Sequence, residues 1–232
     1  FITGITKFTQ ISLFSVLNNL TNISFEPEYA SICGITKQEL LDNFMPEIER
    51  MASDNGWTAD ETLERLKAYY DGYHFSGKNM VDVYNPFSLV NALYQRDLKS
   101  YWAFSGSTSM LPKFVGDMEI HLNDFDHCRI DRVTLESSDV TGGGPELFLY
   151  QSGYLTIKSA DEFGYYLGMP NEEVRQALNA MVLPALTLRK QGETVSLQAS
   201  LLYQLGTGRL DEAKKLLDAL PTSRNLLPPK TL

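Results

Sequence analysis

The sequence predicts a mainly helical α+β fold with small β elements, and three observations carry this prediction. Two of them are capping boxes, in which a Thr is followed three residues later by a Glu and then by an apolar helical stripe: Thr36 with Glu39, and Thr58 with Glu61. The third is a pair of β-like runs, residues 154–158 and 165–169, which flank the turn Ser-Ala-Asp-Glu-Phe-Gly. Amphipathic helices with a short hairpin favour a helical architecture that contains local sheets.

In the first third of the chain, the elements follow from apolar spacing and breaker residues. Residues 1–8 predict the end of a strand, and residues 11–20 predict a short apolar helix. Pro46 lies inside the helix that begins after Thr36, so we expect this helix to kink or to split in two. The next helix begins after Thr58 and is expected to end at Tyr70.

In the middle of the chain, the sequence predicts the first elements clearly and the later ones weakly. Residues 80–84 predict a strand, and Asn85 followed by Pro86 predicts a helix that Asn85 caps. Residues 106–115 predict another helix, irregular around Pro112. Residues 119–135 are polar and weakly periodic, and they predict no definite element.

A linker is expected at residues 141–145, Thr-Gly-Gly-Gly-Pro. A short helix that ends near Gly153, the hairpin, and a helix after Pro170 with Asn171 near its cap then follow. Helix, hairpin and helix in this order are typical of a winged-helix module. Two amphipathic helices, residues 196–206 and 210–220, predict a helical pair at the C-terminal end of the chain.

The composition is that of an ordinary soluble globular protein, with 43% hydrophobic and 21% charged residues. The formal net charge of -9 argues against a broad nucleic-acid surface, because phosphate binding needs clustered Lys and Arg. Cys33 and Cys128 lie far apart and are expected to be buried, reduced thiols, which predicts a cytoplasmic location. We expect no membrane association, since no apolar run approaches the roughly 20 residues of a span.

Residues 72–79 read G-x-x-x-x-G-K-N, one position short of the phosphate-binding loop G-x-x-x-x-G-K-[ST]. A working loop lies between a strand and a helix, whose N-terminus faces the phosphates. Here a helix precedes Gly72 and a strand follows Lys78, while Asn79 offers no hydroxyl for magnesium. We therefore interpret the stretch as a turn in which Gly72 ends a helix and the aromatic side chains anchor the turn to the core.

Other candidate sites are weaker. Residues 121–128, His-Leu-Asn-Asp-Phe-Asp-His-Cys, contain metal-ligand types but lack the paired framework of a structural zinc site, so we expect no metal there. None of the three His residues lies beside a nucleophile motif, so we expect no catalytic residues. The charge patterns Glu-Glu-Val-Arg at 172–175 and Asp-Glu-Ala-Lys-Lys at 211–215 are interpreted as solvated helix faces.

Several stretches, taken together and in order, resemble one family over nearly the whole chain, to about residue 220. They are residues 1–24, 32–40, 69–76, 83–93, 101–106, 149–158 and 165–175. The chain resembles the predicted AAA-ATPase-like family of bacterial proteins, in which a P-loop ATPase module is often followed by a PD-(D/E)xK nuclease-like domain. The resemblance implies that ATP and magnesium bind upstream of the part matched here, and that the nuclease-like domain follows it. No cofactor is expected for this chain alone.

The resemblance also assigns regions and residues. It implies a C-terminal remnant of the ATPase core with a helical, lid-like region over residues 1–140, the winged-helix-like module over 141–190, and a helical hairpin with a tail over 191–232. Nucleotide-proximal residues in the longer protein would be Thr3, Thr6 and Lys7. The family motif residues, which we interpret as structural, are Tyr70, Asp71, Gly72, Tyr73, Asn85 and Pro86.

We therefore expect a non-catalytic lid and winged-helix part of an AAA-ATPase-like protein, with a coupling and protein-contact role. Its expected partners are the ATPase core and nuclease-like domain in the same longer chain, a protein partner, or a second copy. One alternative is a nucleic-acid-binding winged-helix module of a defence or mobile-element system. That alternative requires a set of basic residues to converge on one face: Lys158, Arg175, Arg189 and Lys190. A helical protein that binds polysaccharide or peptide is a third alternative, supported only by the aromatic content.

Overall fold

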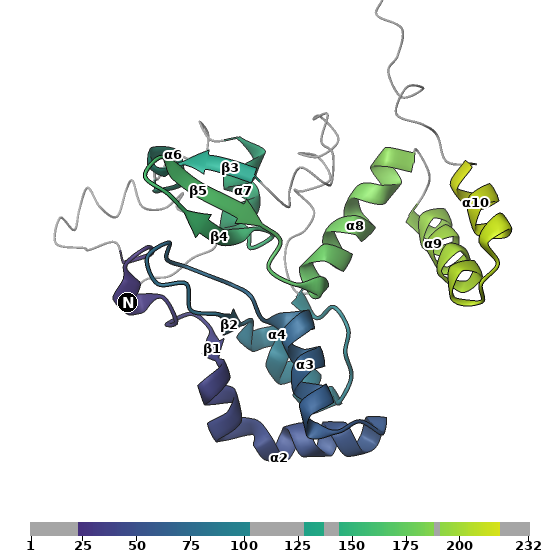
Figure 1. The fold of residues 1–232 in the computed structure, drawn as a ribbon, viewed down its shortest axis with the longest axis horizontal. Helices are drawn as coiled ribbons and strands as arrows, with labels where there is room; N and C mark the ends of the chain where they lie inside the picture. The colour runs from purple at the N-terminus through teal and green to yellow at the C-terminus, as the bar shows by residue number, and fades with distance from the viewer. Residues whose placement is uncertain (1–22, 103–127, 137–143, 188–190, 219–232) are drawn as a thin grey trace, which may run out of the picture. The chain divides into compact units, whose positions relative to one another are not determined.

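The structure is a computed structural model, and it describes residues 23–102, 128–136, 144–187 and 191–218 (Figure 1). Within this part the chain is mainly helical with two small antiparallel sheets, so the predicted α+β class is confirmed. The elements are η2 (Pro27–Tyr29), β1 (Ile35–Thr36), α2 (Lys37–Asn55), α3 (Ala59–Tyr70), β2 (Val83–Tyr84), α4 (Pro86–Gln95), β3 (Cys128–Asp131), α6 (Arg132–Glu136), α7 (Pro145–Gln151), β4 (Thr156–Ala160), β5 (Gly164–Gly168), α8 (Glu172–Thr187), α9 (Gln191–Gly206) and α10 (Leu210–Asp218). They fall into two compact units, Phe1–Thr108 with Glu119–Leu178, and Ser109–Met118 with Asn179–Leu232.

Both predicted capping boxes are present in the first unit. The Thr36 side chain accepts a hydrogen bond from the Glu39 N–H at 3.2 Å, and the Glu39 carboxylate accepts one from the Thr36 N–H at 2.8 Å. Thr58 and Glu61 make the same pair at the start of α3. Each box satisfies N–H groups that a helix start would otherwise leave unpaired.

Pro46 does not split its helix. α2 is one continuous helix from Lys37 to Asn55, and it changes direction along its length (Figure 1). It packs with α3 and α4 around a core of buried apolar side chains: Leu40, Ile48, Met51, Leu66, Tyr70, Tyr84, Leu89, Ala92, Leu93 and Tyr101. This core sets the position of the C-terminal end of α3, where the Tyr-Asp-Gly-Tyr motif lies.

β2 is shorter than the predicted strand at 80–84. It consists of Val83 and Tyr84, which pair antiparallel with β1, and Val83 also bridges to Tyr73. At the far end of this segment the predicted cap is present: the Asn85 side chain accepts a hydrogen bond from the Ser88 N–H at 3.2 Å, with Pro86 at the first helical position. α4 therefore begins where the sequence predicts.

The second sheet has the strand order β3-β5-β4, with antiparallel pairing throughout. β4 and β5 form the predicted hairpin, which is irregular between Ile157 and Ser159. β3 and α6 lie in the polar stretch for which the sequence predicted no definite element. Gly144 and Pro145 of the expected linker begin α7, and the Asn171 side chain accepts a hydrogen bond from the Val174 N–H at the start of α8.

In the second unit, α9 and α10 are the predicted C-terminal helical pair, joined by a turn in which Gly208 has a φ of 72°. α9 begins earlier than the sequence predicted, at Gln191. No helix in the described ranges is both long and apolar enough to cross a membrane.

One prediction about the cysteines is wrong. Neither cysteine forms a disulfide and Cys128 is buried, but Cys33 is exposed. Cys33 lies in the turn just before β1, outside the apolar face of the helical core. The expected strand end at 1–8, the helices at 11–20 and 106–115, and residues 141–143 of the linker lie outside the described residues.

Candidate functional site

The Tyr-Asp-Gly-Tyr motif and the His after it form the candidate functional site, which we call the junction (residues 70–74). All five consecutive backbone carbonyl groups of the junction accept a hydrogen bond. The donors, in chain order, are the Asn85 N–H at 2.9 Å, the Asn171 side chain at 2.9 Å, the Lys158 ammonium at 3.5 Å, the Val83 N–H at 3.2 Å and the Thr156 hydroxyl at 3.0 Å. Three of these donors come from the β4–β5 hairpin and the start of α8, so the junction joins the helical core to the second sheet.

Tyr70 attaches the junction to the helical core. Its ring is fully buried, and its hydroxyl donates to the Lys99 carbonyl at 2.9 Å and accepts from the Lys99 N–H at 3.1 Å. Burial raises the pKa of this phenol well above its ordinary value. Tyr70 therefore serves as a neutral hydrogen-bonding anchor at physiological pH.

Gly72 is the position that requires glycine. Its φ is 90°, and a Cβ there would lie 2.5 Å from the Pro170 carbonyl oxygen. The Lys158 ammonium bridges the carbonyls of Gly72 and Pro170, at 3.5 and 3.4 Å. This close approach of two backbone segments places the start of α8 directly against the end of α3.

Tyr73 and His74 bind the sheet. The Tyr73 hydroxyl donates to the Gly153 carbonyl at 3.2 Å, and the His74 N–H donates to the Thr156 hydroxyl oxygen at 2.7 Å. The two His74 ring nitrogens lie 2.9 Å from the Ile157 carbonyl and 2.7 Å from the Asp82 carboxylate. Because both neighbours accept hydrogen bonds, only a ring with a proton on each nitrogen can donate to both.

The interpretation of residues 72–79 as an aromatic turn agrees with these contacts. The rings of Tyr73 and Phe75 stack with centroids 6.5 Å apart, and Tyr73 is buried. α3 precedes Gly72, and the chain after Lys78 leads to β2 without starting a helix. The helix N-terminus that a phosphate-binding loop needs does not follow this lysine.

Asp71 is a buried acid within the junction. Its side chain is 4% exposed, and its Oδ1 has no hydrogen-bond partner among the residues that the structure describes. Burial raises the pKa of this carboxyl, partly offset by a hydrogen bond from the Gly72 N–H. With Glu64, Lys67 and Asp82 it lines a shallow hollow of about 420 Å³.

Glu173 corrects the interpretation of residues 172–175 as a solvated face. It is fully buried, and one carboxylate oxygen accepts hydrogen bonds from the Ser88 hydroxyl at 3.0 Å and from the Tyr101 and Trp102 N–H groups at 2.6 and 2.9 Å. Its other oxygen has no partner in the described part of the chain. The sequence shows two adjacent glutamates, and only the packing of α8 on α4 decides which of them is buried.

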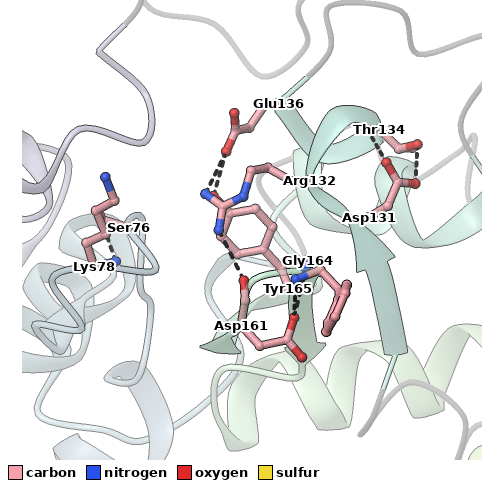
Figure 2. Close-up of polar contacts among 10 residues, drawn as sticks. Ser76, Lys78, Asp131, Arg132, Thr134, Glu136, Asp161, Gly164 and Tyr165 are labelled. Atoms are coloured by element: carbon pink, nitrogen blue, oxygen red, sulfur yellow. Dashed lines mark hydrogen bonds and ion pairs between the residues drawn. The ribbon is translucent and has the colours of Figure 1, made fainter.

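A polar pocket of about 330 Å³ lies beside the junction, between the 76–78 turn, α6 and the hairpin. Figure 2 shows Ser76 and Lys78 on one side and Arg132, Glu136, Asp161 and Tyr165 on the other. In the sequence, Lys78 stands out only as part of the incomplete phosphate-binding pattern at residues 72–79, and nothing marks Arg132 as a candidate. No sequence signal connects these two residues, because the fold brings them together from 54 positions apart.

Several sequence-predicted sites fall outside the described residues. They are Thr3, Thr6, Lys7, Arg189, Lys190 and residues 121–127 of the possible metal-ligand stretch. Of the other basic residues considered for nucleic acid, Lys158 binds backbone carbonyls, and Arg175 lies 3.9 Å from Glu172. Within the described ranges, no group of three or more His, Cys, Asp or Glu side chains is placed to hold a metal ion.

Comparison with known proteins gives one informative match. The chain is similar to a protein of Azotobacter chroococcum mcd 1 described as "Uncharacterized protein in vnfD 5'region", with 30% identity over 206 residues. The match covers 84% of this chain and 37% of that relative, so the chain spans well under half of the relative's length. No family model matches the chain, and no solved structure matches it.

We predict that Gly72→Ala lowers the free energy of unfolding by more than about 2 kcal/mol, because it combines a positive φ with a clash against the Pro170 carbonyl. Gly56→Ala is the matched control. Gly56 also has a positive φ, 69°, but a Cβ there would meet open space. Gly56→Ala should lower the free energy of unfolding by about 1–2 kcal/mol, which is the strain of the left-handed conformation alone. Urea unfolding measures both variants, and equal losses would contradict the role of the close approach.

A second prediction concerns Glu173. Burial raises the pKa of its carboxyl above the ordinary 4.5, against the lowering effect of hydrogen bonds from Trp102, Ser88 and Tyr101. The folded state therefore keeps the Glu173 carboxyl protonated to a higher pH than the unfolded state does. The contribution of this carboxyl to the free energy of unfolding falls as the pH rises from 4.5 to the raised pKa. Glu173→Gln should remove this fall.

Glu172→Gln, the neighbouring substitution on the exposed side of α8, should retain the wild-type pH dependence. Glu173→Ala should destabilise the chain by about 3 kcal/mol or more, since it leaves three donors unpaired. Unfolding free energies measured across the acid range test both statements. A pH profile that is the same in Glu173→Gln and wild type would contradict the linkage.

Proposed function

We propose that the chain is a non-catalytic lid and winged-helix part of an AAA-ATPase-like protein, in which it couples movements and contacts protein partners. The observation that carries this proposal is the junction. A coupling element must transmit a displacement without deforming, and a continuous set of satisfied hydrogen bonds between its two sides provides for this. The carbonyl groups of residues 70–74 supply such contacts between the helical core and the second sheet.

The order of elements supports the winged-helix part of the proposal. Within residues 141–190, α7 is followed by the β4–β5 hairpin and then by α8. This is the order of helix, hairpin and helix on which the sequence-based prediction of a winged-helix module rests. In this proposal the β4–β5 turn is the wing.

An exposed apolar stripe supports the protein-contact role. Phe87, Val90 and Tyr94 lie on one face of α4 and are 49%, 45% and 83% exposed, while the opposite face of α4 packs into the core. Exposed apolar side chains that share a helix face are typical of protein interaction sites. The partner is an ATPase core or nuclease-like domain in the same longer chain, a separate protein, or a second copy.

In this proposal the longer protein binds the nucleotide and magnesium, and it is located in the cytoplasm. The chain aligns with 37% of a relative's length, which supports the proposal that it acts as one part of a larger protein. Thr3, Thr6 and Lys7 would lie near the nucleotide held by the ATPase core.

We predict that the purified chain gives no saturable heat when Mg-ATP is titrated into it by calorimetry. The chain contains no G-x-x-x-x-G-K-[ST] sequence, and its nearest approach to one is the aromatic turn. A P-loop ATPase measured in the same buffer is the positive control. Binding in the micromolar range would overturn the non-catalytic proposal.

The nucleic-acid alternative is favoured by the winged-helix order alone, and the wing argues against it. The tip of the β4–β5 turn carries Asp161 and Glu162, and the nearby Lys158 is held by backbone carbonyls. We predict that the chain does not retard duplex DNA in a gel at low salt. Retardation that disappears as salt is added would favour the alternative, because binding to phosphates releases counterions.

A further inference from the structure

The polar pocket beside the junction depends on a close approach at Gly77. A Cβ at Gly77 would lie 2.7 Å from the Ala160 Cβ and 2.8 Å from Tyr165 Cε1. The absence of a side chain lets the 76–78 turn lie against the hairpin. As a result, Lys78 lines the same pocket as Arg132 of α6.

Two carboxylates that line this pocket are already hydrogen-bonded within the protein. The Asp161 carboxylate accepts hydrogen bonds from the Phe163 and Gly164 N–H groups at 2.8 and 2.9 Å, and these contacts, with Arg129 nearby, lower its pKa. The Glu136 carboxylate accepts from the Tyr165 hydroxyl at 2.7 Å and from Arg132 at 3.4 Å. Both acids keep their negative charge, but each also lies 3.4 Å from a guanidinium, Arg129 for Asp161 and Arg132 for Glu136, which offsets that charge.

The two cations, in contrast, have donors to spare. Arg132 contacts Glu136 at 3.4 Å, the Tyr165 hydroxyl at 3.2 Å and the Asp161 carbonyl at 3.2 Å, which uses three of its five N–H groups (Figure 2). Its guanidinium also lies over the Tyr165 ring, 5.0 Å from the centroid, which holds the group in place. The Lys78 ammonium has no partner among the residues that the structure describes.

We propose that this pocket binds the oxyanion group, phosphate or carboxylate, of a small polar ligand between the Lys78 ammonium and the Arg132 guanidinium. A positioned guanidinium and a mobile ammonium are a usual pair for such groups. The pocket volume of about 330 Å³ limits the ligand to a small molecule. Glu26 also lines the pocket, and its carboxylate has no hydrogen-bond partner in the described ranges, so the remainder of the ligand should carry N–H or O–H donors.

This site differs from a phosphate-binding loop although it uses the same Gly-Lys pair. In such a loop, backbone N–H groups and a helix N-terminus hold the phosphate. Here Gly77 allows a close approach and Lys78 supplies charge, while the second cation comes from α6. The site is therefore independent of the proposed ATPase context, and it does not require that the chain bind a nucleotide.

The test is a titration of the full chain with inorganic phosphate, followed by amide chemical shifts in NMR at constant ionic strength. We expect saturable shifts at residues 76–78, in α6 and in the β4–β5 turn. Lys78→Met and Arg132→Gln should each raise the dissociation constant about tenfold, the usual worth of a charged hydrogen bond. A parallel titration with acetate distinguishes the two oxyanions, and saturable binding of either supports the proposal.

Two further variants separate a site from general electrostatics. Lys37→Met removes an exposed ammonium outside the pocket and should leave phosphate binding unchanged. Glu26→Gln removes the one carboxylate of the pocket lining that forms no ion pair with a guanidinium of the described residues, and it should lower the dissociation constant. Lys78 and Glu26 are both exposed, so these variants should fold normally, as the unperturbed part of the spectrum will show. Absence of saturable shifts with both anions, or equal effects of Lys78→Met and Lys37→Met, would overturn the proposal.

Discussion

The backbone hydrogen bonding of residues 70–74 is the constraint on which the first unit depends. A helix that ends beneath another layer of structure must find donors for its last carbonyl groups, because unpaired buried carbonyls cost about 1–3 kcal/mol each. The Tyr70 carbonyl at the end of α3 accepts from Asn85, the cap of α4, and the carbonyls of the next four residues find donors on β2, the hairpin and the start of α8. The helical core and the second sheet are therefore linked through one short segment of main chain.

The side chains around the junction follow from this constraint. Gly72 is needed because a Cβ there would lie 2.5 Å from the Pro170 carbonyl oxygen, and the Lys158 ammonium donates to the carbonyl groups of both Gly72 and Pro170. Glu173 performs a parallel task a few residues later. Its buried carboxylate accepts hydrogen bonds from a hydroxyl of α4 and from two N–H groups of the 101–102 segment, so these contacts also hold the start of α8.

The polar pocket is a by-product of the same arrangement. Once Tyr73 and His74 are bound to the sheet, the chain must pass the hairpin before it reaches β2, and Gly77 permits this passage without a clash. Lys78 and Arg132 then line one cavity, each with donors that the described residues leave unused. The junction and the pocket differ in chemistry: the backbone carbonyl groups of the junction are all hydrogen-bonded within the protein, and the pocket has charge available for a ligand.

The local elements could be predicted from the sequence because their causes are local. Capping boxes, the Asn85-Pro86 helix start and the hairpin around residues 159–164 depend on side chains within a few positions of each other. The same local reasoning identified residues 72–79 as an aromatic turn, since the order of helix and strand around them is readable from the sequence. Local signals could not show that Glu173 is buried in the core while the adjacent Glu172 is not. They also could not show that Cys33, an apolar residue type, lies in an exposed turn.

The sequence by itself determined the α+β class, the starts of α2, α3 and α4, and the absence of a complete phosphate-binding sequence. The tertiary structure alone decided what the motif residues do. The donors to residues 71, 72 and 74 come from 82 or more positions away, and Lys78 and Arg132 are 54 positions apart. Such contacts depend on how the helical core packs against the sheet, and a pattern of neighbouring residues carries no information about that packing.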